Sequence, residues 1–185
     1  MGLTVRERGE IVATFRYIHV HLMETLAAWV PTTPEMEVKL CFGAHIWDVA
    51  QHADIFGKRV HELRMPLQHS LQPSEAYVEV LTELAAATET GQRVAGFYDM
   101  VLPALASRYR HYLDLTDTLM DAPTVRILER CLTDQARMIR ESQELREQVS
   151  LVTDPGWVQR LAERESAIEN FVLHRRRGQL AKETP

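Results

Sequence analysis

Residues 34–64 read PEMEVKLCFGAHIWDVAQHADIFGKRVHELR, and this stretch decides the fold. Its apolar residues recur at three- and four-residue spacing, which is the period of an amphipathic α-helix and not of a strand. Thr33 is predicted to cap this helix and Pro34 to occupy its first position, because a hydroxyl acceptor and a fixed backbone angle suit those places. One face of the predicted helix carries Val38, Cys41, His45, Asp48, Val49, His52 and Phe56.

The same spacing runs through the rest of the chain, so the fold is predicted to be all-α. Further helices are predicted over residues 4–29, 74–88, 92–116 and 121–149, and from residue 155 onward. Asp121 is predicted to cap its helix, and Pro103 to kink the helix that contains it. The last helix is predicted to turn Ile168 and Phe171 inward. Long helices with short connections favour an antiparallel bundle with one additional C-terminal helix.

The length and the net charge of the chain limit the number of domains and the kinds of binding partner that we expect. A chain of 185 residues with 45% hydrophobic residues suits one domain, predicted over residues 1–177, with a disordered tail at 178–185. The net charge of -5 and a single basic run at 174–177 argue against nucleic acid. The sequence lacks an apolar run of about 20 residues and a secretory signal, so we expect a cytoplasmic protein without membrane contact. Cys41 and Cys131 are expected to be reduced.

Three polar residues, His45, Asp48 and His52, stand at positions i, i+3 and i+7 of the predicted face in residues 34–64. An unpaired polar group in a core costs about 1 to 3 kcal/mol, so these side chains need partners. One interpretation is a self-satisfied network with Tyr98 or Tyr109 that fixes the helix register. The other is a catalytic site, in which the histidines act as acid and base and Asp48 orients an imidazole. The same three residues are also the candidate ligands of one metal ion.

Other residues are predicted to line a pocket next to these three or to pack the core. Tryptophan side chains bury large areas, so Trp29, Trp47 and Trp157 are predicted to anchor helix packing. The candidate pocket-lining residues are Glu10, His19, Tyr98, Tyr109, Gln135 and Met138.

Two segments carry a resemblance to a known group. The stretches PEMEVKL at 34–40 and HIWDVAQHAD at 45–54, followed by ELR at 62–64, resemble ferritin-like helical-bundle proteins of actinobacteria. DAPTVRIL at 121–128 and DQARM at 134–138 resemble a second signature of the same group. The resemblance covers about a third of the chain. It implies a ferritin-like bundle, in which a Glu from each of two helices and Glu-x-x-His from two others hold two irons.

This chain departs from that ligand pattern. His52 matches a ligand histidine, but Val49 stands three residues before it where the pattern has Glu. Gln135 and Met138 take the Glu and His places of the second motif. A carboxylate-bridged di-iron centre is therefore not expected, and the prediction is no cofactor or a single non-haem iron or manganese ion.

The sequence leaves several functions open. The favoured hypothesis is an enzyme that transforms a small molecule at an altered, metal-free or mononuclear site in the bundle core, with a role in secondary metabolism as one setting. The alternatives are a metal-free ligand-binding or interaction protein, for which a homodimer is one form, and a non-haem di-iron oxygenase or oxidoreductase. A thiol-transferase-like bundle with a three-histidine metal site is a weaker alternative, because His45 and His52 share one helix.

Overall fold

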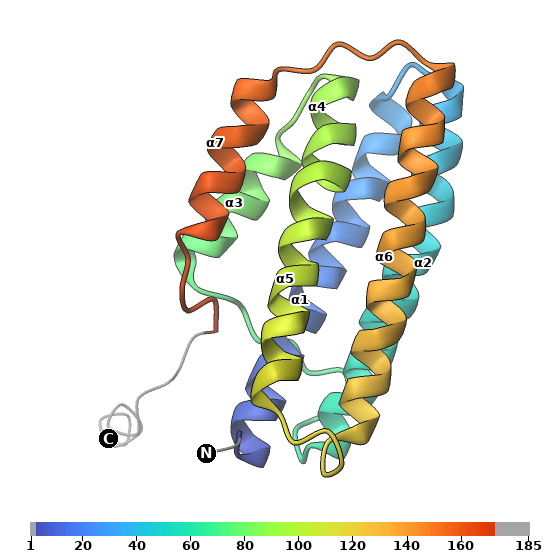
Figure 1. The fold of residues 1–185 in the computed structure, drawn as a ribbon. Coiled ribbons are helices and arrows are strands. Elements are labelled where there is room, and N and C mark those ends of the chain that lie inside the picture. The colour runs from blue at the N-terminus through green and yellow to red at the C-terminus, as the bar shows by residue number, and fades with distance from the viewer. Residues whose placement is uncertain (1–2, 173–185) are drawn as a thin grey trace, which may run out of the picture.

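The computed structural model describes residues 3–172 and confirms the all-α prediction (Figure 1). Four long columns form the bundle, and two shorter helices flank it. The columns are α1 (Val5–Trp29), α2 (Met36–Glu62), a third column of α4 (Thr90–Ala95), η2 (Gly96–Val101) and α5 (Leu102–Leu115), and α6 (Ala122–Gln148). The flanking helices are α3 (Glu75–Ala85) and α7 (Pro155–Ser166), and a single turn, η1 (Val30–Thr32), joins α1 to α2.

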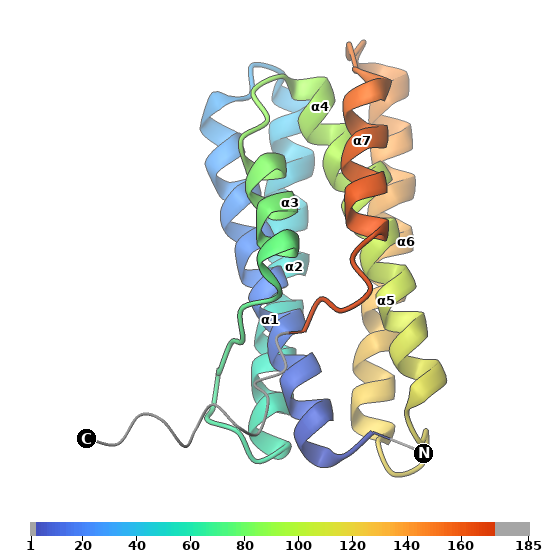
Figure 2. The same ribbon diagram turned by 90° about the vertical axis from the view of Figure 1, so that its left-hand side faces the viewer.

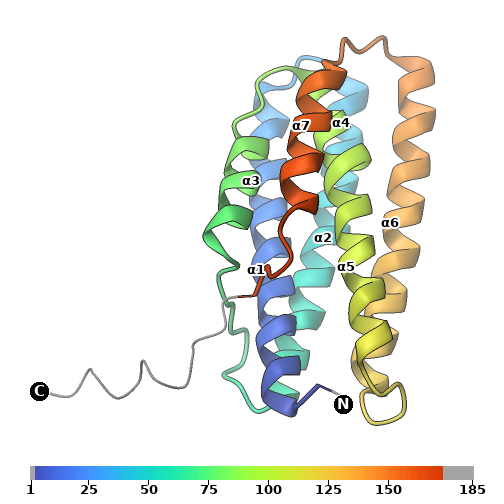
Figure 3. The same ribbon diagram turned by 60° about the vertical axis from the view of Figure 1, so that its left-hand side comes forward.

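The order of the columns follows from one long connection. In Figure 1, α1 ascends and α2 descends, and residues 63–89, which include α3, then return to the top of the bundle. The third column therefore descends parallel to α2, and α6 ascends antiparallel to both. Helix α7 descends outside the bundle, beside α3, in Figures 2 and 3. Ion pairs from Arg164 to Glu79 and Glu83 connect these two flanking helices.

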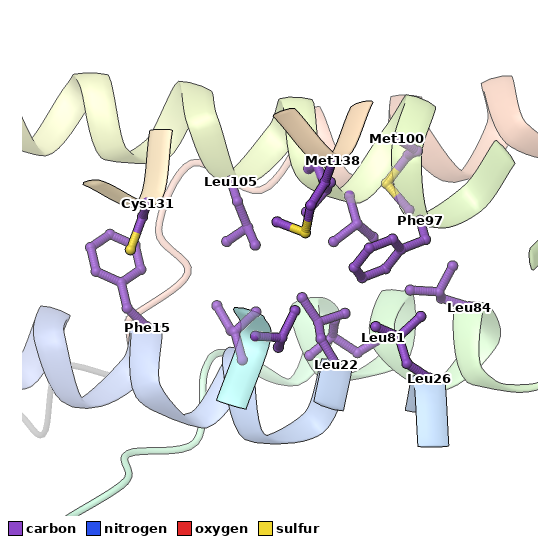
Figure 4. Close-up of a cluster of buried hydrophobic side chains, with 14 of the residues drawn as sticks. Phe15, Leu22, Leu26, Leu81, Leu84, Phe97, Met100, Leu105, Cys131 and Met138 are labelled. Carbon is purple, nitrogen blue, oxygen red and sulfur yellow. The ribbon is translucent and has the colours of Figure 1, made fainter. Parts of the chain in front are cut away.

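Side chains from every column fill the core (Figure 4). Leu22 and Leu26 of α1 face Leu81 and Leu84 of α3, and all four are buried. From the other side of this core come the buried side chains of Phe97, Met100, Leu105, Cys131 and Met138. Burial of such apolar area is the main source of stability in a bundle of this size.

The tryptophan predictions are right at one position and wrong at another. Trp29 is buried, and its indole N–H donates to the carbonyl oxygen of Ala85 at 3.2 Å. Trp47 is 68% exposed and anchors no packing within the described part of the chain. It lies on the outer face of α2, two residues from His45, where the helical period turns it away from the core.

The second helix begins later than predicted. Its first residue is Met36, and Glu35 stands at the N-cap. The Thr33 hydroxyl does not cap α2, because it donates to the carbonyl oxygen of Trp29 at 2.9 Å and accepts from Arg93 at 3.0 Å. The buried Arg93 of the third column thus donates to the Thr33 hydroxyl that was predicted to cap α2.

Pro103 disturbs its helix through a π-helical segment. The N–H of Leu102 donates to the carbonyl of Phe97, five residues earlier, and η2 occupies the six residues from Gly96 to Val101. Proline lacks an N–H and its ring collides with the carbonyl four residues before it, so a locally wider turn relieves the conflict. Tyr98 lies in this π-helical segment, a kind of distortion that often occurs at functional sites.

The last helix is shorter than predicted. Helix α7 ends at Ser166, so Ile168 and Phe171 lie beyond it. Arg108 of α5 donates to the carbonyl oxygens of Glu165 and Ile168, both at 3.2 Å. Its guanidinium thus provides hydrogen-bond donors for carbonyl groups at the C-terminal end of α7. The chain then turns back, and the carbonyl of Phe171 accepts from the N–H of Ser74 at 2.7 Å. The predicted tail at 178–185 lies outside the described residues.

Asp121 serves a buried network and not the predicted helix cap. Its position is the N-cap of α6, but its carboxylate makes no capping bond. It accepts from Tyr112 at 2.6 Å, Thr124 at 2.6 Å and Arg59 at 2.7 Å. Burial alone would raise the pKa of this carboxyl, but the hydrogen bonds from Thr124, Tyr112, Arg59 and Thr116 outweigh burial and lower the pKa. The network joins α2, α5 and α6 at one end of the bundle.

We predict that Asp121→Asn lowers the free energy of unfolding by about 3 kcal/mol or more, because it leaves the buried Arg59 without its anion on that side. Urea denaturation at pH 7 measures the change. Asp114→Asn, an exposed position on α5, is the matched control and should shift stability by less than about 0.5 kcal/mol. Equal losses in the two variants would contradict the assignment of a structural role to the network.

Candidate functional site

The site is centred on the buried imidazole of His45, which joins three helices. From α2, Nε2 lies 2.7 Å from Oε2 of Glu141 on α6, and Nδ1 lies 2.7 Å from the Tyr98 hydroxyl on η2. The Glu141 carboxylate can only accept, so Nε2 carries the proton and donates to it. Nδ1 then accepts from the O–H of Tyr98. His45 and Tyr98 are buried, whereas the Glu141 side chain is 37% exposed.

Burial keeps this imidazole neutral. Burial lowers the pKa of His45, and this effect exceeds the opposite effects of Glu141 and Asp48, while Arg137 lowers the pKa further. For Glu141, burial acts to raise the pKa, but the hydrogen bonds from His45 and Arg137 prevail and the pKa is lowered. Near neutral pH the pair is therefore a neutral imidazole and an ionised carboxylate.

Cys41 extends the chain of hydrogen bonds by one group. Its sulfur lies 3.4 Å from the Tyr98 hydroxyl and 3.7 Å from Nδ1 of His45, one helical turn away on the same face of α2. Burial raises the pKa of the thiol, so it remains protonated and can donate to the Tyr98 oxygen. The bonds then point in one direction, from Cys41 through Tyr98 and His45 to Glu141.

The three predicted catalytic residues each meet a charged residue of α6. His45 pairs with Glu141, Asp48 lies 2.9 Å from Arg137, and Nε2 of His52 lies 2.9 Å from Oδ2 of Asp134. Because α2 and α6 are antiparallel, the order along α6 is reversed: positions 45, 48 and 52 meet 141, 137 and 134 (Figure 1). We call these six residues the α2–α6 ladder.

The ladder changes the predicted role of Asp48. This residue was expected to orient an imidazole, but its hydrogen-bonded partner is the guanidinium of Arg137. The carboxylates that orient the histidines come from α6, as Glu141 and Asp134. Arg137 also lies 3.3 Å from Glu141 and 3.6 Å from Asp134, so this one guanidinium contacts all three acids of the ladder. Arg130 adds a second cation, 3.7 Å from Asp134.

The sequence contains one pattern that indicates the α6 partners of His45, Asp48 and His52. Asp134, Arg137 and Glu141 repeat the i, i+3, i+7 spacing of the α2 residues. Charged residues at helical spacing usually mark a solvated face, so this pattern by itself does not identify a partner. Two matching spacings with complementary groups in reverse order are the informative feature.

The predicted pocket-lining residues fall into different places. His19 lies edge-on to His52, with ring centres 5.1 Å apart, and its Nε2 is hydrogen-bonded to the Tyr109 hydroxyl. Burial lowers the pKa of both histidines. Glu10 lies near the start of α1, with its side chain 12% exposed, and is paired with Arg6 at 2.8 Å.

Gln135 and Met138 are buried on the inner face of α6, as predicted. Both amide atoms of Gln135 are buried without a hydrogen-bond partner in the protein.

The donor set does not fit the di-iron centre that the resemblance would imply. Within residues 3–172, no group of three or more His, Cys, Asp and Glu side chains is arranged to hold a metal ion. The candidate ligand set of His45, Asp48 and His52 is included in this result. Both nitrogens of His45 are engaged by Glu141 and Tyr98, and Asp48 is paired with Arg137.

Two surface cavities lie away from His45. The larger, about 590 Å³, is lined by α5, α7 and the segment after α7, with Arg108, His111 and Phe171 among its residues. The smaller, about 350 Å³, lies between the ends of α2 and α6 beside Arg59.

No family model, curated protein or solved structure matches this chain. Among the helices of residues 3–172, none is long and apolar enough to cross a membrane.

We predict that His45→Gln flattens the acid side of the stability profile. The unfolded imidazole binds a proton below its ordinary pKa of about 6.5, whereas the folded one does so only at lower pH. The stability from His45 is therefore full above that pKa and is lost as the pH falls, with a limiting slope of about 1.4 kcal/mol per pH unit. Urea unfolding between pH 7.5 and 5.5 measures this slope.

The exposed His111 provides the matched control for this experiment, as His111→Gln. The groups that face His45 are Glu141, Asp48, Arg137, Tyr98 and Cys41, and they are unchanged in both variants. Parallel profiles for the wild type and His45→Gln would show that the imidazole is not held neutral by burial.

Proposed function

We propose that this chain is an enzyme that transfers protons to or from a small polar molecule, with the Glu141–His45–Tyr98 chain as its metal-free acid–base group. One observation carries this proposal. A buried, neutral imidazole is clamped between a partly exposed carboxylate and a buried hydroxyl, each at 2.7 Å. Enzymes commonly use such perturbed, oriented groups for acid–base chemistry.

The proposed mechanism assigns one role to each group. Glu141, the most exposed of the three, meets the substrate and exchanges a proton with it. In each turnover Glu141 takes a proton from one atom of the substrate and returns it to another, so the carboxylate ends as it began. His45 donates from Nε2 to Glu141 throughout and stabilises its charge, while Tyr98 donates to Nδ1 and holds the ring in this tautomer. Cys41 stays a thiol and donates to the Tyr98 oxygen.

The surface around Glu141 supports a polar substrate. Arg137 is 35% exposed and lies between Asp48 and Glu141, so it offers a guanidinium to an anionic or carbonyl group. The proposed substrate is therefore small, polar and able to accept hydrogen bonds, and it lies over the α2–α6 surface.

The proposed scaffold is a ferritin-like bundle. Support comes from the single long crossover at residues 63–89, which makes α2 parallel to the third column. One such crossover in a four-helix bundle is the connectivity of ferritin-like folds. In this proposal the bundle keeps its polar interior face, and α6 supplies carboxylates outside the usual ligand positions.

A second candidate function is small-molecule binding at the cavity between α5 and α7. A volume of about 590 Å³ falls in the range of ligand pockets. Arg108 lies in its wall with its guanidinium held by Glu165 at 2.6 Å and stacked over Phe171. A bound molecule that is retained unchanged, and is lost in Ser107→Trp, would favour this candidate.

We predict that the wild-type protein introduces deuterium into at least one metabolite, or converts one, when it is incubated with a bacterial metabolite extract in D₂O. Mass spectrometry detects both events. His45→Gln and Glu141→Gln should lower the rate by about 100-fold or more, in line with the loss of an acid–base group. Glu144→Gln, one turn along the exposed side of α6, is the matched control.

Full activity in the His45→Gln variant would contradict the proposed role of the imidazole. A wild-type protein that neither labels nor converts any metabolite would contradict the proposal as a whole.

A further inference from the structure

A second group of buried polar atoms takes no part in the proton chain. The His19 and His52 rings are in contact, and Gln135 follows Asp134, the partner of His52, on the inner face of α6. His19 of α1, His52 of α2 and Gln135 of α6 are each at most 1% exposed. Nδ1 of His19, Nδ1 of His52 and both amide atoms of Gln135 have no hydrogen-bond partner in the protein. Buried polar groups almost always have partners, so these four atoms together indicate an additional occupant.

In each of the two histidines, the hydrogen bond at Nε2 decides whether Nδ1 carries a proton or a lone pair. Nε2 of His52 donates to the Asp134 carboxylate, so its Nδ1 carries a lone pair. Nε2 of His19 is hydrogen-bonded to the Tyr109 hydroxyl. When Nε2 donates in that bond, Nδ1 of His19 also carries a lone pair, and this is the tautomer that the proposed ion requires. A histidine whose outer nitrogen is bonded to a carboxylate or hydroxyl is the usual arrangement of a metal ligand.

The geometry of the two rings is consistent with one shared ion. Zinc–nitrogen bonds of about 2.1 Å and a tetrahedral angle place the centres of two ligand imidazoles about 5 Å apart. The ring centres of His19 and His52 are 5.1 Å apart, with an angle of 88° between the planes. Burial lowers the pKa of both rings, which favours the neutral form that binds metals.

We propose that His19, His52 and the amide oxygen of Gln135 bind a single divalent transition-metal ion in the bundle core. The donor set holds two nitrogens, one neutral oxygen and no carboxylate. It therefore favours a borderline ion such as Zn²⁺ or Co²⁺ over Mg²⁺, which requires several oxygen ligands. The set contains only two residues of the His, Cys, Asp and Glu types, so it is distinct from a carboxylate centre.

The size of the occupant follows from the walls of the site. The neighbouring side chains on the inner face of α6, Cys131 and Met138, are fully buried, and Phe15 and Phe56 lie close to Tyr109 and His19. Neither of the two described cavities includes these residues. The proposed occupant is therefore a single ion and not a larger molecule, and the test separates a metal ion from a buried water molecule.

The experiment is a titration of Co²⁺ into the full-length protein, purified without a histidine tag, at pH 7.5. We expect saturable binding of one ion per chain, visible ligand-field absorption, displacement by Zn²⁺ and no competition by Mg²⁺. Gln135→Leu should weaken Co²⁺ binding by at least about 10-fold, and it removes an unpaired amide, so the fold should survive. His52→Gln should abolish binding, and His111→Gln, at an exposed histidine, should leave it unchanged.

Absence of saturable Co²⁺ binding by the wild-type protein would overturn the proposal in favour of a buried water. Full affinity retained in Gln135→Leu or in His52→Gln would also overturn it, because the ion would then lie elsewhere. The readout is independent of catalysis, so a failure of the proposed proton-transfer function leaves this test intact.

Discussion

The α2–α6 ladder is the interaction on which the rest of the structure depends. Two antiparallel helices place three polar residues each at the same spacing, and every residue on one helix finds a complementary partner on the other. A shift of one helix by a turn would leave two buried imidazoles without partners, which costs about 1 to 3 kcal/mol for each. The ladder therefore fixes the register of α2 against α6 and, through Tyr98, the position of the third column.

The same contacts that fix the register also create unequal environments for the histidines. His45 connects a partly exposed carboxylate to a buried hydroxyl, and both of its ring nitrogens are hydrogen-bonded. His52 has the same kind of carboxylate partner, but its Nδ1 is unpaired and its ring lies against the buried His19. We propose that the first histidine serves proton transfer and that the second binds an ion. The π-helical segment at η2 contributes to this difference because it carries Tyr98.

The sequence was sufficient for the all-α class, for the approximate helix boundaries and for the inward face of α2. It was not sufficient for the partners of that face. Asp134, Arg137 and Glu141 look like ordinary surface charges, and only the antiparallel packing shows which of them meet a histidine. Asp121 illustrates the same limit, because an acid before a proline at a helix start is equally compatible with a cap and with a buried partner for Arg59. Local signals identify polar residues, and tertiary contacts decide their roles.

The central claim is that His45 is a neutral imidazole with its proton on Nε2, held between Glu141 and Tyr98. A two-bond proton–nitrogen correlation spectrum of the histidine rings at pH 7, with His45→Gln to assign the signals, tests it most directly. The structure predicts a neutral ring with a protonated Nε2 and an acceptor Nδ1. A doubly protonated ring, or a proton on Nδ1, would contradict the orientation of the whole hydrogen-bond chain.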